Sequence, residues 1–139
     1  VIEKESTKSF SKLKQLALTD PHPKVRAMAI QKLSLFDDVE QQELNEVYTQ
    51  VLKDSSYRVI SEALKSIKKV DPQRGLELAK DMEEIENVLI NITIASIYAE
   101  IGKATEHEYF KTTIKELNGF NKYSFMQQYL KFILQQKKN

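Results

Sequence analysis

Two stretches of this sequence match each other without a gap at an offset of 34 residues, and this repeat limits the fold more than any other feature. Residues 20–33 read DPHPKVRAMAIQKL and residues 54–67 read DSSYRVISEALKSI. Each copy places an aspartate, a basic residue, a valine, an alanine and two aliphatic residues at the same steps. This repeat length is typical of helix pairs that stack on one another, because one pair alone cannot bury its apolar face.

Apolar residues recur with a period near 3.6 along most of the chain, which predicts helices rather than strands. Only three glycines and three prolines occur among the 139 residues, and they fall between the periodic stretches. We therefore expect an all-α fold joined by short turns. The expected helices number about eight and cover residues 6–18, 23–36, 40–53, 56–69, 72–82, 85–101, 106–118 and 121–136.

Several helix ends carry recognisable capping signals. Asp71-Pro72 places a carboxylate before a proline at the first helical position. The sequence Thr105-Glu106-His107-Glu108 has the form of a capping box, with Glu108 as the partner carboxylate. Gly102 and Gly119 suit the left-handed residue just past a helix end.

The stretch 85–101 is apolar around almost its whole circumference. Such a helix must be covered on most sides. We expect its neighbours in sequence, near 72–82 and 106–118, to cover it.

The residue types that the two copies share each have a physical role. The aspartate can cap the second helix or tie its turn to the next repeat, and the alanine lets two helices approach closely. This pattern resembles the HEAT repeat, and the resemblance implies a right-handed α-α superhelix formed as a single helical-repeat domain over residues 1–139. The alternative is an irregular helical bundle with one chance duplication. The structural residues that carry the resemblance are Asp20, Val25, Arg26, Ala29, Asp54, Arg58, Val59 and Ala63.

Composition excludes several classes of site and leaves the compartment open. The absence of cysteine rules out disulfides, thiolate metal sites and cysteine nucleophiles. With 21 basic and 20 acidic residues, the chain has no global field to attract nucleic acid or anionic lipid. The longest stretch without charge, 87–99, is too short to span a membrane. Cytoplasm and periplasm both fit, and the start at Val1 without a methionine suggests a C-terminal fragment of a longer protein.

No catalytic, cofactor or metal site is expected in this chain. His107-Glu108 invites comparison with the zinc-binding H-E-x-x-H helix, but position 111 is lysine, whose ammonium would repel a divalent cation. There is no glycine-rich phosphate loop and no nucleophile elbow. We therefore expect the chain not to be an enzyme on its own.

The last expected helix is apolar on more than one side. Phe125, Tyr129 and Phe132 lie on one face, while further apolar residues occupy much of the remaining circumference. A terminal repeat normally presents a polar outer face. Phe125, Tyr129 and Phe132 are therefore either core residues or a docking face for another domain or chain.

The closing sequence carries a second resemblance. Residues 105–111, TEHEYFK, and 118–133, NGFNKYSFMQQYLKFI, are similar to the end of bacterial M1-family zinc aminopeptidases, and the repeat region is similar to their helical C-terminal domain. The resemblance implies that zinc and the catalytic motifs lie in another domain of the parent protein. This fragment would then pack on that catalytic domain and cover the cleft that receives the peptide substrate.

An independent HEAT-like scaffold for protein–protein interaction is the main alternative. A nucleic-acid-binding repeat is less favoured, because acidic residues lie close to the basic ones and the net charge is only +1. No membrane partner is expected. The basic residues that such a nucleic-acid surface would use are Arg58, Lys65, Lys68, Lys69, Lys111, Lys115, Lys122, Lys131, Lys137 and Lys138.

Overall fold

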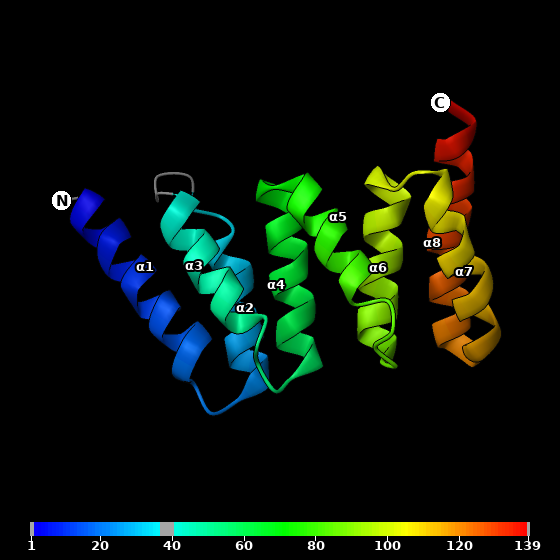
Figure 1. Ribbon diagram of the computed structural model, residues 1–139. Coiled ribbons are helices and arrows are strands. Elements are labelled where there is room, and N and C mark those ends of the chain that lie inside the picture. The colour runs from blue at the N-terminus through cyan, green and yellow to red at the C-terminus, as the bar shows by residue number, and fades with distance from the viewer. Residues whose placement is uncertain (1, 37–40, 139) are drawn as a thin grey trace. The chain divides into compact units, whose positions relative to one another are not determined.

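The computed structural model describes residues 2–36 and 41–138, with side chains from residue 8 onward. These residues form helices and no strand, which confirms the all-α prediction (Figure 1). Two short 3₁₀ helices, η1 and η2, flank α7. The bounds are α1 Ile2–Thr19, α2 Pro23–Leu33, α3 Gln41–Val51, α4 Tyr57–Val70, α5 Pro72–Asp81, α6 Val88–Ile101, η1 Ala104–Glu106, α7 His107–Thr113, η2 Ile114–Glu116 and α8 Gly119–Lys138.

The chain divides into two compact units, Val1–Ile67 and Lys68–Asn139. In the first unit α1 packs against α2 and α3. Three of the pairs that match at the 34-residue offset are buried in both copies: Ala29 with Ala63, Ile30 with Leu64, and Leu33 with Ile67. The repeat in the sequence is therefore a repeat of core positions. The single domain expected over residues 1–139 stays a prediction.

In the second unit the apolar helix α6 is covered, as expected, but mainly by a different neighbour. It packs most extensively against α8 and also against α5. From α7 it receives ring contacts, because Tyr98 meets Tyr109 and Phe110 edge-on. The expectation that residues 106–118 would be a principal cover of α6 was incomplete, because that stretch contains only the seven-residue helix α7 and the 3₁₀ turn η2.

Most predicted helices are present, with shifted ends. The start at Asp71-Pro72 is confirmed, since the Asp71 carboxylate accepts a hydrogen bond from the Arg74 N–H at 3.2 Å. The helix predicted from residue 85 begins at Val88, because Asn87 is extended and caps it by accepting from the Ile90 N–H. Glu40, where the third predicted helix starts, lies outside the described residues.

The two glycines predicted to be left-handed behave differently. Gly119 is left-handed, with φ of +56°, and stands at the start of α8. Gly102 is not, since its φ is −71° and its ψ 161°. A side chain is excluded there by space instead, because a Cβ atom on Gly102 would lie 2.5 Å from the Tyr98 carbonyl oxygen.

The capping carboxylate near residue 105 is Glu106 and not Glu108, which corrects the sequence prediction. Glu106 is 4% exposed and accepts hydrogen bonds from the Lys103 N–H and the Thr105 hydroxyl. Because the helical segment starts two residues earlier than expected, as η1, Glu106 occupies the third position of its first turn. Glu108 is exposed and pairs with Lys111 at 3.6 Å.

No helix within residues 2–36 and 41–138 is both long and apolar enough to cross a membrane.

Candidate functional site

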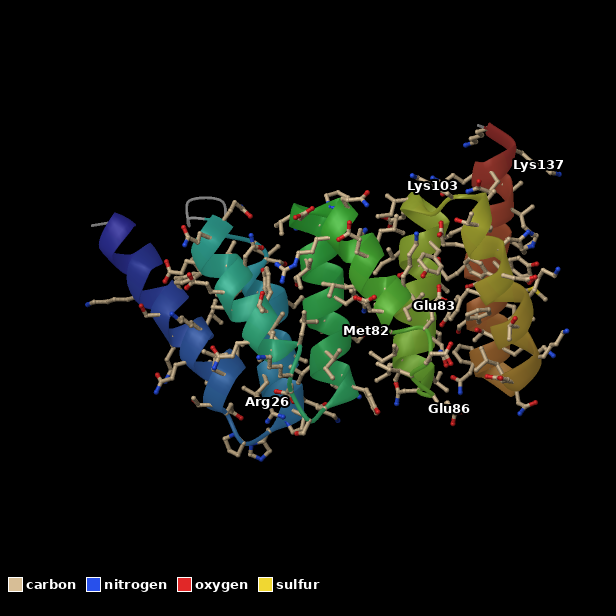
Figure 2. The ribbon with its side chains drawn as sticks, in the orientation of Figure 1. Arg26, Met82, Glu83, Glu86, Lys103 and Lys137 are labelled. Atoms are coloured by element: carbon tan, nitrogen blue, oxygen red, sulfur yellow. The ribbon has the colours of Figure 1, made fainter. Side chains whose placement is uncertain are left out.

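The repeat signature in the first unit forms a polar link between successive helix pairs. Arg26, on α2, donates from Nε and Nη2 to the two carboxylate oxygens of Asp54, both at 2.9 Å. Its Nη1 donates to the backbone carbonyl of Asp20 at 2.8 Å. Arg26 lies beside the loops that join α1 to α2 and α3 to α4 (Figure 2). One guanidinium therefore holds two turns that are 34 residues apart in sequence.

The electrostatics of this link favour both charged forms. Burial alone would raise the pKa of Asp54, but hydrogen bonds from Arg26 and from the Ser56 N–H lower it. The hydrogen bond to Asp54 raises the pKa of Arg26. Asp20 accepts from the His22 N–H at 2.8 Å, so the two repeat aspartates each close a turn.

The other signature residues divide into core and surface. Ala29, Val59 and Ala63 are buried, whereas Val25 is half-buried and Arg58 is exposed. These positions explain the packing of the first unit. They assemble no chemical site.

In the second unit Phe125 and Phe132 lie in the core rather than on a docking face. They are 0% and 1% exposed. Phe110, from α7, stacks on Phe132 with ring centroids 4.8 Å apart and on the half-buried Tyr129 at 5.0 Å. Of the two readings of this aromatic face, the structure therefore supports the core.

His107 belongs to the same aromatic cluster. Its Nε2 lies 2.6 Å from the Tyr129 hydroxyl, and its ring lies edge-on to Tyr129 and beside Phe132. Among the described residues no group of three or more histidine, aspartate or glutamate side chains is arranged to hold a metal ion. The histidine helps to fix α8 against α7.

The opposite side of α8 presents a row of exposed apolar side chains, which we call the outer face of α8. Tyr123 is 60%, Leu130 54% and Leu134 59% exposed, and Met126 is 41% exposed. Their spacing of three or four residues places them in one stripe along the helix. Phe120, 80% exposed, extends the stripe at the first turn, with its ring 6.2 Å from that of Tyr123.

The charged residues of α8 are lysines only, and they border this stripe. No aspartate or glutamate occurs between residues 119 and 138. All four side chains are exposed, and Lys137 lies near the C-terminal end of the helix (Figure 2). The four are Lys122, Lys131, Lys137 and Lys138. The outer face of α8 is thus an apolar stripe in a positive border.

The residues of this face are evident in the sequence, but their exposure could not be predicted from it. Apolar residues occupy both sides of α8, so periodicity alone cannot say which side faces the core. The aromatic residues Phe125, Tyr129 and Phe132 are the more distinctive set in the sequence, and they are the ones that Phe110 packs against. The less conspicuous stripe is the exposed one.

A polar depression of about 260 Å³ lies where the loop before α6 meets α7. Two of its carboxylates have partners, because the Tyr98 hydroxyl donates to Glu83 and Lys111 pairs with Glu108 at 3.6 Å. Burial raises the pKa of Tyr109, also in its wall, to about 12, so its phenol stays protonated. Figure 2 places Glu83 and Glu86 in the connection between α5 and α6. The acidic residues that line it are Glu83, Glu84, Glu86, Glu108 and Glu116.

Residues 10–89 match the family model described as HEAT repeats. The match covers more than half of the chain and includes both copies of the 34-residue unit. A search of the curated proteins and a search of the solved structures each returned no match.

Proposed function

This chain belongs to the HEAT-repeat family, and from that premise we propose that it is a non-catalytic scaffold that binds another protein. Stacked helix pairs present extended surfaces, and such surfaces are what repeat proteins use to bind partners. The proposal places the binding surface on the outer face of α8.

The observation that carries the proposal is the exposure of this face. Tyr123, Leu130 and Leu134 are each more than half exposed along one side of α8. Exposed apolar side chains gathered in one patch mark sites of interaction, whereas scattered ones do not. A protein partner that covers the stripe would remove this apolar surface from water.

The absence of catalysis is part of the same proposal. Two polar groups of the second unit make structural contacts: Glu106 caps η1 and pairs with Lys80, and His107 contacts Tyr129. We accordingly propose no cofactor for this chain.

The narrower hypothesis, that the chain packs on the catalytic domain of an M1-family zinc aminopeptidase, stays a prediction. It rests on the resemblance of residues 105–111 and 118–133, together with that of the repeat region, and zinc would then belong to the catalytic domain. Determining the gene sequence upstream of Val1 tests it. The hypothesis fails if no H-E-x-x-H helix is encoded within several hundred residues.

The scaffold proposal is tested by comparing two variants of the full-length natural protein in its own cells. One carries Tyr123→Ser, Leu130→Ser and Leu134→Ser on the outer face of α8. The matched control carries Leu35→Ser, since Leu35 is as exposed as those residues, at 62%, but lies in the first unit. Each is affinity-purified, and the co-purifying proteins are quantified by mass spectrometry.

We expect at least one protein to co-purify with the wild type and with the control, and to be reduced about tenfold or more with the outer-face variant. Circular dichroism of the purified chains checks that all three fold. Equal recovery of every co-purifying protein by the two variants would contradict the assignment of binding to this face.

A further inference from the structure

We propose that the outer face of α8 binds an amphipathic helix whose apolar stripe is flanked by aspartate and glutamate. This inference rests on the proposed scaffold function and specifies the chemistry of the partner. It follows from the shape of the stripe and from the charges beside it.

The shape of the stripe fits a helix. Tyr123, Met126, Leu130 and Leu134 follow one another at steps of three, four and four residues, so they run along the helix axis for about 16 Å. An amphipathic helix laid along α8 would contact this stripe through residues at the same spacing. A β-strand would gain no backbone hydrogen bonds here, because the backbone of α8 is bonded within its own helix.

The charges specify the flanks of the partner. Lys122 stands one turn before Met126, Lys131 one turn before Leu134, and Lys138 one turn after it. Within the described part of the chain, none of the ion pairs involves a lysine of α8. A partner with carboxylates beside its apolar stripe would meet this positive border on both sides.

The same charges disfavour a second copy of this chain as the occupant. Packing one α8 against another would bring lysines against lysines, because α8 carries no acidic residue to pair with them. Like charges across an interface are repulsive. An anionic membrane surface has the same negative charge as the proposed partner. The experiment below distinguishes binding to such a membrane from binding to an acidic helix.

The proposal can be tested by titrating the full chain with synthetic peptides of about 18 residues, roughly five helical turns. The first peptide is an amphipathic helix with leucines on one side and glutamates beside them. In the second, lysine replaces each glutamate, and the third has the composition of the first in scrambled order. Fluorescence anisotropy measures each dissociation constant, at low and at high salt.

We expect the acidic amphipathic peptide to bind at least about tenfold more tightly than either of the others. Its affinity should fall as salt screens the lysine border. The double variant Lys122→Gln/Lys131→Gln should weaken it several-fold, whereas the control Lys24→Gln, exposed in the first unit, should leave it unchanged. Leu130→Ser should weaken it and Leu35→Ser should not.

The inference is overturned if the lysine peptide binds as tightly as the glutamate peptide, or if no peptide binds at about 100 μM. It is also overturned if Lys122→Gln/Lys131→Gln and the control Lys24→Gln bind the acidic peptide with the same affinity. Tighter binding to phosphatidylserine vesicles than to the acidic peptide, lost in Lys122→Gln/Lys131→Gln, would assign the face to membranes instead. The proposed function fails separately, when outer-face substitutions leave every co-purifying protein in place. If the peptide test fails but the outer-face substitutions still reduce the recovery of a co-purifying protein, the proposed scaffold function stands and only the acidic helix is excluded.

Discussion

The link between Arg26 and Asp54 gives the sharpest prediction about stability. The two side chains are 11% and 12% exposed and share two hydrogen bonds of 2.9 Å. Exposed ion pairs contribute about 0–1 kcal/mol, whereas removing one member of a fully buried pair costs about 3–5 kcal/mol. For a pair that is mostly buried, we expect Asp54→Asn to lower the free energy of unfolding by about 2–3 kcal/mol.

Equilibrium unfolding in urea, followed by circular dichroism, measures this change. Arg26→Ala should destabilise by a similar amount, because it also removes the hydrogen bond to the Asp20 carbonyl. The double variant should cost less than the sum of the two single variants, since they remove the same link. Arg58→Ala is the control and should change stability by less than about 0.5 kcal/mol, because Arg58 is exposed.

The pH dependence has a definite sign. Because the pKa of Asp54 is lower in the folded state than in the unfolded chain, its contribution is present at neutral pH. It is lost as the pH falls below the unfolded pKa of about 3.9. Asp54→Asn should remove this part of the acid destabilisation. A stability for Asp54→Asn within about 0.5 kcal/mol of wild type at pH 7, or strictly additive variants, would refute the reasoning.

The second unit offers three further predictions, each measured by urea unfolding. Glu106→Gln should destabilise by about 1–2 kcal/mol at pH 7, and less as the pH falls through about 4, because the pKa of Glu106 is lowered in the folded state; an equal effect at both pH values would count against it. Gly102→Ala should destabilise by about 1–3 kcal/mol, since its Cβ would crowd the Tyr98 carbonyl; wild-type stability would show that the turn relaxes freely. Phe132→Ala should cost about 3–5 kcal/mol and Leu134→Ala less than about 0.5 kcal/mol; similar costs would mean that the two faces of α8 are assigned wrongly.

The first unit could be predicted from the sequence because the same pattern of residue types occurs in it twice, 34 residues apart. The matched apolar pairs Ala29 with Ala63, Ile30 with Leu64, and Leu33 with Ile67 occupy equivalent buried positions in two helices. The aspartate was expected to cap a helix or tie one repeat to the next, and Asp54 makes the second kind of contact through Arg26. Position 60, which matches Arg26 in the second copy, is isoleucine, so the guanidinium link occurs once within this pair.

The second unit was harder to predict, since local signals there compete. Glu106 and Glu108 are both placed to cap a helix, and the choice depends on where the 3₁₀ turn begins. The inward side of α8 is set by the fit of Phe125 and Phe132 against Phe110, which is a tertiary contact that the sequence pattern does not contain. The candidate site therefore became visible only once the core was known.

Site-specific photo-crosslinking tests the central claim most directly, namely that the outer face of α8 is a protein-binding surface. A photoreactive amino acid replaces Leu130 in the full-length natural protein, and in a matched control it replaces the exposed Gln50 of α3. After irradiation in the cell, adducts are resolved by mass and identified. We predict a discrete protein adduct from position 130 that is absent from position 50. Equal adducts from both positions, or none from position 130, would contradict the account.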